Sequence, residues 1–267
     1  MYIRVLVIVW LGFIGPANAN TLRAGGVGAV TKLLPILYAG FGDAASLEVI
    51  PSLGSSGGLR ALAEGALDVA VSGRPLNAEE VKQGMRVVLA MRTPFVLVTS
   101  HPKPNGLKSA DIAEIFRAQK STWADGSLLH VILRPKSDTD TSILGGMFPG
   151  MVSAIESART RQDVPVAATD QDNADAAERI SGSLTGSTLT QIKTEQRPLR
   201  LLSIDGVTPS LEALESGAYP FSKTIYFILP AKNNPSAEAF VAFLRSPAGQ
   251  AMLRGGGNFV IPDPSKS

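Results

Sequence analysis

The chain has 267 residues, of which 45% are hydrophobic and 18% are charged, and it contains no cysteine. These values fit a folded protein of one large or two modest domains, and they exclude disorder, collagen-like repeats and a disulfide scaffold. The formal net charge is only +2 and no basic block stands out, so the sequence does not indicate nucleic-acid or membrane-surface binding. Any bound anion must therefore be held by local geometry.

The N-terminus has the pattern of a signal peptide. Arg4 precedes an apolar run at 5–14, and Ala-Asn-Ala at 17–19 supplies the small residues that a signal peptidase reads. We predict cleavage after Ala19, which removes residues 1–19. A membrane anchor is the alternative, but the apolar run is only ten residues long, whereas a spanning helix needs about 20. We expect the mature protein to be free in a periplasm or outside the cell.

From residue 22 onward, short apolar runs alternate with amphipathic stretches, a pattern typical of α/β proteins with mainly parallel strands. In the first part of the chain we expect strands at 22–25, 47–51 and 68–72, and helices at 31–41 and from the glycine-rich turn 54–58 to about residue 64. A β-rich run at 86–100, interrupted by Pro94, is too long for one ordinary strand. We expect it to cross between two lobes.

The proline-rich segment 101–104 separates this set of elements from a second one. There we expect helices at 109–116, from 142 toward 158, at 174–181 and at 235–253 with a break near Pro247, and strands at 128–133, 199–204 and 223–229. The simplest architecture has two α/β lobes joined by a hinge, each a mainly parallel sheet flanked by helices. Residues 20–95 and 223–267 would form the first lobe, and residues 96–222 the second.

Three loops lie between an expected strand and the start of a helix, where backbone N–H groups and the helix dipole converge on an anion. They are residues 25–31, 54–58 and 134–142. Glycines allow close backbone approach, serine and threonine hydroxyls add donors, and Arg134 supplies a guanidinium that matches an oxyanion. Each loop alone could be ordinary turn and cap chemistry, but together they predict a small anion site.

Two other motifs have alternative interpretations. Residues 54–58 satisfy G-x-S-x-G, which would make Ser56 a hydrolase nucleophile. A catalytic triad would need a histidine and an acid, but the only histidines are His101 and His130, and the sequence identifies no acid partner for either. The acidic stretch 170–175 lacks the glycine and the final glutamate of a calcium loop, so we interpret its acids as helix caps.

Several segments occur in an order that is itself informative. They are Gly-Val-Gly-Ala-Val at 26–30, Gly-Ser-Ser-Gly-Gly at 54–58, Asp-Val-Ala-Val-Ser-Gly-Arg-Pro-Leu at 68–76, residues 107–116 with Trp123, the loop from Arg134 to Thr141, and residues 204–210, 217–222 and 240–249. In this order they resemble the phosphate-binding proteins of ABC transporters over nearly the whole mature chain. The resemblance implies the fold of a type II periplasmic binding protein, with a ligand held between the lobes.

The resemblance also implies which residues bind. Ala29 and Val30 would supply backbone contacts, and Ser55 would donate from its hydroxyl and its amide. Arg134, Ser137 and Thr139 would form the clamp from the second lobe. With their neighbours in the same turns, the expected ligand-binding residues are Ala29, Val30, Ser55, Ser56, Gly57, Gly73, Arg74, Arg134, Ser137, Asp138 and Thr139.

The sequence departs from the family at several of these positions. Gly73 stands where phosphate binders have an aspartate that accepts the ligand's proton, and Ala29 replaces a threonine. The serine-glycine-threonine of the family becomes Ser-Asp-Thr at 137–139, followed by Asp140. Asp138 or Asp140 could replace the missing acceptor. Alternatively, these acids only cap the next helix, and the cleft binds another small ligand or none.

We therefore expect a non-enzymatic, exported solute-binding protein that captures a small oxyanion, with phosphate as the leading ligand, for an ABC transporter. The alternatives are a periplasmic sensing or accessory domain with altered specificity and a serine hydrolase built on Ser56. The expected partners are the oxyanion and a membrane permease or sensor, with no nucleic acid, no cofactor and no metal, and the chain is expected to be a monomer. Arg74 could point into the cleft or pair with Glu79 or Glu80 at the surface.

Overall fold

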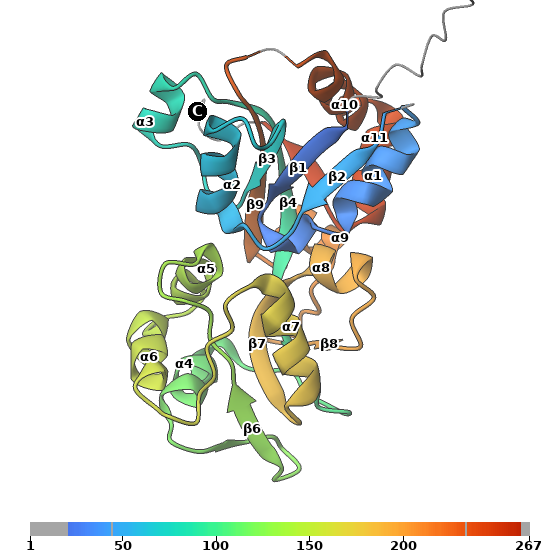
Figure 1. Cartoon of the computed structure of the whole chain (residues 1–267). Helices are drawn as coiled ribbons and strands as arrows, with labels where there is room; N and C mark the ends of the chain where they lie inside the picture. Colours follow the sequence, from blue (N-terminus) through green and yellow to red (C-terminus); the bar gives the residue numbers. More distant parts are fainter. Residues whose placement is uncertain (1–20, 44, 233, 263–267) are drawn as a thin grey trace, which may run out of the picture.

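The computed structural model describes residues 21–43, 45–232 and 234–262. The predicted signal peptide lies outside these residues and stays a prediction. The chain folds into two α/β lobes, one above the other in Figure 1. None of the helices within the described ranges has both the length and the apolar character that crossing a membrane requires.

The first lobe, at the top of Figure 1, combines segments from both ends of the described chain. Its elements are β1 (Leu22–Gly26), the 3₁₀ helix η1 (Gly28–Val30), α1 (Leu33–Phe41), β2 (Leu47–Ile50), α2 (Gly54–Ala63), β3 (Val69–Ser72), α3 (Ala78–Lys82), the first part of β4 (Arg86–Thr99), β9 (Ser222–Leu229), α10 (Pro235–Arg245), α11 (Pro247–Gly255) and β10 (Phe259–Ile261). β1 pairs in parallel with β2 and β3, but β9 lies antiparallel between β3 and β4. The sheet is therefore mixed rather than mainly parallel, because β9 returns to the lobe beside β4 in the opposite direction.

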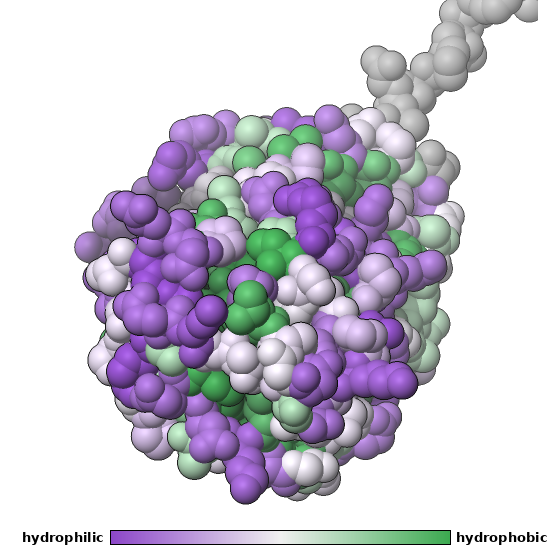
Figure 2. All heavy atoms as spheres, turned by 90° about the horizontal axis from the view of Figure 1, so that it is seen from below, coloured by the Kyte–Doolittle hydropathy of each residue, from purple (hydrophilic) through white to green (hydrophobic). Residues whose placement is uncertain are grey.

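The second lobe is built from the middle of the chain. Its elements are α4 (Ser109–Arg117), β5 (Ser121–Thr122), β6 (Leu128–Val131), α5 (Thr139–Met147), α6 (Met151–Arg159), α7 (Asp170–Arg179), β7 (Ser183–Thr188), α8 (Leu189–Thr194), β8 (Arg200–Leu201) and α9 (Leu211–Glu215). β6 and β7 are parallel, while β7 and β8 pair antiparallel with the second part of β4. Seen from below, this end of the molecule is largely hydrophilic, with smaller hydrophobic areas between the polar ones (Figure 2).

One strand joins the two lobes. β4 has 14 residues, and Pro94 lies opposite Ser222 at the point where β9 begins. From Phe95 onward, β4 pairs with β7 instead of β9. Proline has no N–H to donate to a ladder, so it fits where one pairing ends and another begins. The prediction that the long β-rich run crosses between lobes is confirmed.

Separate hydrophobic cores lie in the two lobes. In the first, one cluster packs α1, α10 and α11 against one side of the sheet, and another packs α2 against the other side. In the second, Phe95, Phe116 and Tyr219 belong to one cluster, and Val96 and Val98 to another. The core residues change lobe between Met91 and Phe95 and again between Tyr219 and Ile225. We therefore propose to keep the lobe boundaries near residues 95 and 222.

The sequence analysis predicted no strand at β7, although all six residues of this strand are buried. Its buried hydroxyl groups are hydrogen-bonded inside the lobe. Ser183 Oγ donates to Ala177 O at 2.7 Å, and Thr185 Oγ1 lies 3.0 Å from Ile132 O and 2.9 Å from Asn173 Oδ1. Buried polar groups are tolerated when they are paired in this way. A strand rich in serine and threonine can therefore occupy a core position that apolar residues usually fill.

Replacing the Thr185 hydroxyl by a methyl group should destabilise the second lobe. Thr185→Val keeps the shape of the side chain but removes the one hydroxyl hydrogen that lies between Ile132 O and Asn173 Oδ1, so a buried acceptor loses its donor, which costs about 1–3 kcal/mol of unfolding free energy. The matched control is Thr160→Val, since Thr160 is exposed and its hydroxyl bonds only Ser157 O. We expect the control to change stability by less than about 0.5 kcal/mol in urea unfolding. Equal effects of the two changes would show that the buried hydroxyl contributes nothing of its own.

Candidate ligand-binding site

A cleft of about 340 Å³ lies between the two lobes. Its lining comes from the turn before η1, the start of α2, the loop between β6 and α5, and the start of α7. The lining residues are Val27, Gly28, Ser52, Leu53, Gly54, Ser55, Ser56, Gly57, Arg74, Arg134, Pro135, Ser137, Asp138, Thr139, Ala168, Thr169, Asp170, Gln171 and Lys223. Eight of the eleven expected ligand-binding residues are among them. A larger groove of about 800 Å³, lined by Arg23, Asp68 and Lys232 among others, contains none of the expected residues.

The first lobe contributes mainly neutral donors. Ser55 lies in the first turn of α2, and its Oγ accepts a hydrogen bond from Gly73 N at 2.8 Å. That bond leaves the hydroxyl hydrogen of Ser55 available to a ligand. Val27 and Gly28 bring the backbone to the cleft, whereas the buried Ala29 and Val30 are not among the lining residues. Their side chains pack into the core of the first lobe.

Gly73 lies directly beside the cleft, and the space next to it is occupied. A Cβ atom at this position would lie 2.9 Å from Lys223 Cε and 3.4 Å from Ser55 Oγ. A contact under 3.0 Å requires the neighbouring atom to move. The side chain of Lys223 therefore takes the room that an aspartate at Gly73 would need.

Arg74 lines the cleft and also forms an ion pair with Glu80. Its guanidinium donates to the two carboxylate oxygens of Glu80 at 2.9 and 2.7 Å, and it approaches Ser56 Oγ at 3.4 Å. The hydrogen bond with Glu80 raises the pKa of Arg74 and lowers that of Glu80. Of the two alternatives for Arg74, the pair with Glu80 is formed at the rim of the cleft. The guanidinium is thus already neutralised before any ligand arrives.

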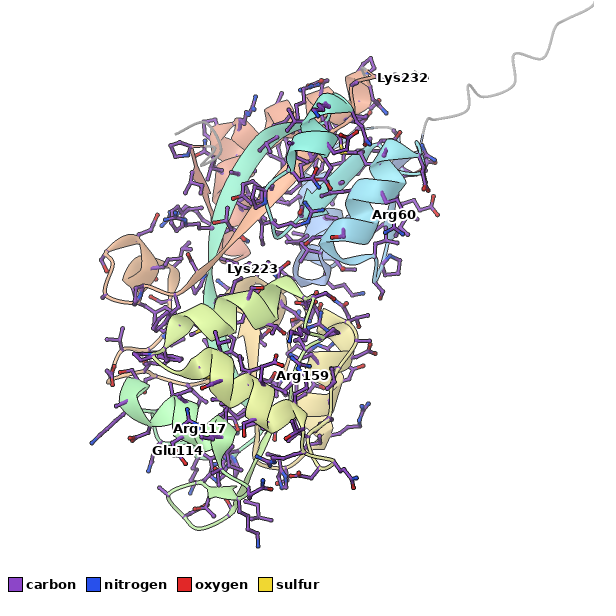
Figure 3. The ribbon with its side chains drawn as sticks, turned by 90° about the vertical axis from the view of Figure 1, so that its left-hand side faces the viewer. Arg60, Glu114, Arg117, Arg159, Lys223 and Lys232 are labelled. Atoms are coloured by element: carbon purple, nitrogen blue, oxygen red, sulfur yellow. The ribbon has the colours of Figure 1, made fainter. Side chains whose placement is uncertain are left out.

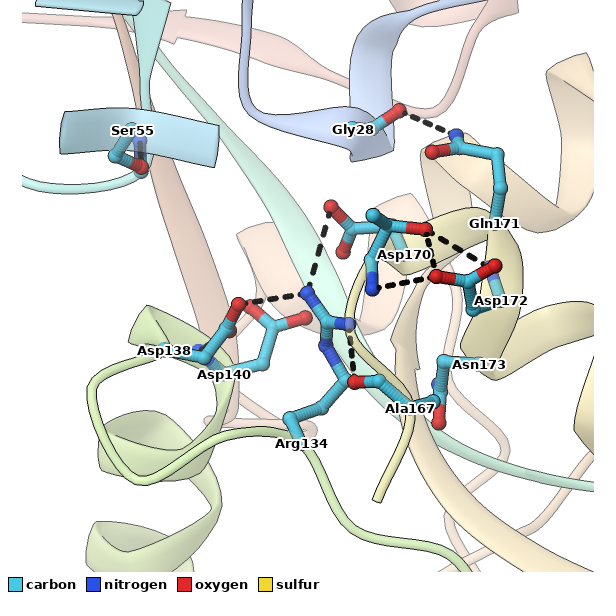
Figure 4. Close-up of polar contacts among 12 residues, drawn as sticks. Gly28, Ser55, Arg134, Asp138, Asp140, Ala167, Asp170, Gln171, Asp172 and Asn173 are labelled. Atoms are coloured by element: carbon cyan, nitrogen blue, oxygen red, sulfur yellow. Dashed lines mark hydrogen bonds and ion pairs between the residues drawn. The ribbon is translucent and has the colours of Figure 1, made fainter. Parts of the chain in front are cut away.

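Arg134 is the guanidinium of the second lobe, and Figure 4 shows how it is held. It is 7% exposed, donates to Ala167 O at 2.8 Å and to Asp138 Oδ2 at 2.6 Å, and lies 4.0 Å from Asp170 Oδ2. Its Nε atom is buried and has no hydrogen-bond partner. Asp138 also caps α5, because its other oxygen accepts from Asp140 N at 2.8 Å. Asp138 therefore does two things at once. It caps α5, as one alternative predicted, and it also lines the cleft.

Asp140 forms a buried ion pair with Lys223 across the junction of the lobes. Lys223 lies in β9, and Figure 3 shows it between the two lobes. The side chains of Lys223 and Asp140 are only 1% and 4% exposed. Burial raises the pKa of Asp140 to about 6, helped by the nearby Asp170 and opposed by Lys223. Burial alone would lower the pKa of Lys223, but the surrounding carboxylates raise it.

The sequence analysis missed three cleft residues with charged or amide side chains, Lys223, Asp170 and Gln171. It interpreted the acids at 170–175 as helix caps, which is confirmed for Asp172, since Asp172 and Thr169 form the capping box of α7. Asp170 is 7% exposed and lines the cleft, and its carboxylate accepts no hydrogen bond from the described residues. Tertiary packing brings the start of α7, and Asp170 with it, beside the loop that carries Arg134. The sequence shows only that Asp170 lies in an acidic stretch.

Gln171 links the lobes directly. Its Nε2 donates to Gly28 O in the first lobe at 3.0 Å and to Glu195 Oε1 in the second at 2.9 Å. Its Oε1 is buried and has no partner. Two residues of the cleft lining thus each have one buried unpaired atom, the donor Arg134 Nε and the acceptor Gln171 Oε1.

The two histidines lie elsewhere. The sequence identified no acid partner for His101, but the structure supplies one, since His101 Nε2 is 3.0 Å from Asp125 Oδ2. His101 also stacks on Trp123, with ring centroids 5.0 Å apart. Neither histidine lines the cleft that contains Ser56, so no triad forms there. Among the described residues, no group of three or more acidic, histidine or cysteine side chains is arranged to hold a metal ion.

Known proteins share this fold. A phosphate-binding protein PstS of Borreliella burgdorferi is 23% identical over 213 residues, which is 75% of each chain. The crystal structure of a putative phosphate ABC transporter substrate-binding protein from Clostridium perfringens, with bound phosphate, superposes with a TM-score of 0.73 at 14% identity, covering 91% of this chain and 100% of the other. A phosphate-binding protein from Stenotrophomonas maltophilia gives a TM-score of 0.66 at 14% identity, covering 91% of both chains.

At these identities the solved structures establish the two-lobed fold, and they agree with the architecture inferred from the motif order. The family comes from a separate comparison. The model of the PBP superfamily domain, PBP_like_2, matches residues 14–248, which is most of the chain. This protein therefore belongs to the periplasmic binding protein superfamily, as a phosphate-binding-protein-like substrate-binding protein.

Proposed function

We propose that this protein is an exported solute-binding protein that captures a small oxyanion, with phosphate as the leading ligand, for an ABC transporter. The observation that carries the proposal is the convergence of Ser55 from the first lobe with Arg134 and Thr139 from the second on one cleft. Hydroxyl and guanidinium donors are groups that bind the oxygens of a tetrahedral anion. Relatives and structural neighbours that are themselves phosphate-binding proteins support the same ligand class.

The proposal assigns a role to each side of the cleft. Ser55 and the amides at the start of α2 would bind one face of the anion, in a turn rich in glycine. Arg134, with Ser137 and Thr139, would bind the other face. Gln171 would hold the lobes together, because its bond to Gly28 O spans them.

Export and membrane partners extend the proposal beyond the cleft. We propose that the signal peptide at 1–19 directs the chain to the periplasm, where it works as a monomer. When two lobes close on a ligand, the position of one lobe's outer surface relative to the other changes. A permease can recognise this closed arrangement. The binding site lies at the boundary that such a motion closes.

A sensing or accessory domain is the second candidate. The observation that favours it is the state of the cations: Asp138 already pairs with Arg134, and Asp140 with Lys223. A cleft whose cations are neutralised internally can bind anions more weakly than a transport receptor needs. The domain would then report ligand at high concentration to a membrane partner instead of delivering it.

Phosphate should stabilise the folded protein. A ligand that binds only the native state at a concentration of 100 Kd adds about 2.7 kcal/mol to the unfolding free energy. We expect the melting temperature of the mature chain to rise with phosphate by several degrees, and calorimetry to give one site. Native mass spectrometry of protein purified from its own periplasm should retain the same anion. No change in melting temperature at millimolar phosphate would contradict phosphate as the ligand.

Removing the Ser55 hydroxyl should weaken anion binding. A hydrogen bond to a charged ligand is worth about 1.5–3 kcal/mol, so Ser55→Ala should lower phosphate affinity by about 10- to 150-fold in calorimetry. Ser153→Ala is the matched control, since Ser153 is exposed in α6 and its hydroxyl bonds Gly150 O. The control should bind like the unmodified protein. Equal affinity in both variants would remove Ser55 from the site.

The hydrolase alternative predicts turnover that depends on Ser56. Its hydroxyl faces Arg74 at 3.4 Å and has no histidine beside it in the cleft. A serine without a base is a weak nucleophile. We expect no difference between the unmodified protein and Ser56→Ala in the hydrolysis of an activated ester. Turnover abolished by Ser56→Ala would favour an enzyme over a binding protein.

A further inference from the structure

The charges of the cleft do not balance. Three cations line the cleft, and one of them, Arg74, is paired with Glu80 at the rim. The other two, Arg134 and Lys223, lie among three carboxylates: Asp138 and Asp170, which line the cleft, and Asp140, which does not line it but pairs with Lys223. Asp138 has a direct hydrogen bond from Arg134, and Asp140 has one from Lys223. Asp170 is left over. With every group ionised, the cleft carries one more negative charge than positive charge.

Asp170 is the least compensated of the three carboxylates. Arg134 Nη2, its closest cationic atom, lies 4.0 Å away and already donates to Asp138 at 2.6 Å. Asp170 is more than nine-tenths buried, and its carboxylate accepts no hydrogen bond from any described residue. Its Oδ2 lies close to Gly28 in the first lobe, since a Cβ atom built on Gly28 would be 2.4 Å from it. The surplus charge therefore sits where the lobes meet.

The remaining charged groups around Asp170 do not supply a free cation. On the first lobe, Arg74 is paired with Glu80. On α8, Glu195 adds another carboxylate, which is held by Arg197 at 2.7 Å and is joined to the cleft through Gln171. Lys223 in β9 is engaged by Asp140. A ligand anion entering this cleft would meet no unpaired positive side chain among the described residues.

An additional negative charge in this setting is unfavourable unless a proton comes with it. Like charges in a desolvated site repel strongly, and one of them becomes protonated instead. Burial raises the pKa of Asp140 to about 6 although Lys223 opposes the shift, and the charges of Asp170 and Asp138 raise it further, so this carboxyl holds a proton more readily than an ordinary one does. A bound oxyanion adds a further negative charge, which favours protonation of a carboxylate or of the ligand still more. Arg134 and Gln171 line the cleft, and each has a buried atom without a partner, the donor Nε and the acceptor Oε1.

We propose that this cleft takes up one proton with each oxyanion it binds, and that the surplus carboxylate of Asp170 creates this requirement. The inference rests on the proposed function and specifies its ligand class. The bound state is an oxyanion that shares one proton with the carboxylates of Asp170, Asp140 and Asp138. Dihydrogen phosphate and singly protonated phosphonates can bring this proton themselves. Sulfate carries no proton near neutral pH, so one of the protein's carboxylates would have to be protonated when sulfate binds.

The sign of the pH dependence follows from linkage. The complex holds one more proton than the free protein and the free dianion, so binding tightens as the pH falls. Between about pH 7.5 and pH 8.5, the affinity for phosphate should fall by about tenfold, because one proton is coupled to binding. A flat affinity over this range would overturn the inference and would need no variant to establish it.

Calorimetry measures the proton directly. Phosphate is titrated into the mature protein at about pH 8.5, where free phosphate is the dianion, in two buffers with different ionisation enthalpies. We expect the unmodified protein to take up about one proton per phosphate, and Asp170→Asn to take up close to none. Asp170→Asn should also bind sulfate about tenfold more tightly than the unmodified protein at this pH, since one negative charge has gone.

Asp111→Asn is the matched control. Asp111 lies in the first turn of α4, as Asp170 does in α7, but it is exposed and outside the cleft. It should keep the proton uptake and the sulfate affinity of the unmodified protein. Phosphate binding without proton uptake, or equal uptake in Asp170→Asn, would overturn this inference and leave the proposed function intact. A complete lack of phosphate binding at every pH would overturn both.

Discussion

The cleft is organised by the need to pair a buried lysine. Lys223 lies in β9, where that strand leaves the junction of the lobes, and its side chain is almost fully buried. An unpaired ammonium there would be very costly, so a carboxylate must reach it. Asp140 does so from the start of α5, and this contact fixes the second-lobe loop against the first lobe. The same lysine occupies the space beside Gly73. The ion pair thereby holds the lysine side chain where a side chain at position 73 would have to displace it.

The distribution of charge between the lobes follows from this arrangement. The first lobe presents hydroxyls, amides, an arginine that Glu80 neutralises at the rim, and Lys223, which is paired with Asp140. Arg134 and the three cleft carboxylates all come from the second lobe, on the loop before α5, in its first turn and at the start of α7. An anion would therefore find neutral donors and paired cations on the first-lobe side, and one arginine among three carboxylates on the second-lobe side. The cations of the cleft are already paired with carboxylates of the protein, so they attract a ligand anion only weakly. Selectivity between anions then depends more on the ligand's protonation state and on its hydrogen bonds than on its net charge.

Much of the fold was predictable because it follows local patterns. The crossing strand, the break at Pro247 and the glycine-rich start of α2 each rest on apolar runs or on turn residues. β7 was missed because its hydroxyl side chains carry no apolar signal, and their hydrogen bonds come from segments far away in the chain. The mixed sheet could not be read from the sequence either, since alternating strands and helices do not show where β9 is inserted. The motif order could place the lobes but not the direction of every strand.

The candidate site divides in the same way. Ser55, Arg134 and Thr139 were accessible because they lie in recognisable loops, and the structure brings them to one cleft. Asp170 and Gln171 were not, since the identity of a residue at the start of a helix does not say what the other lobe places opposite it. The contact of Gln171 with Gly28 joins positions 143 residues apart. The residues that decide the charge of the bound ligand are therefore those whose role arises only when the lobes meet. A family motif that locates a binding cleft can in consequence leave the ionisation state of its ligand undetermined, even where eight of the lining residues have been identified.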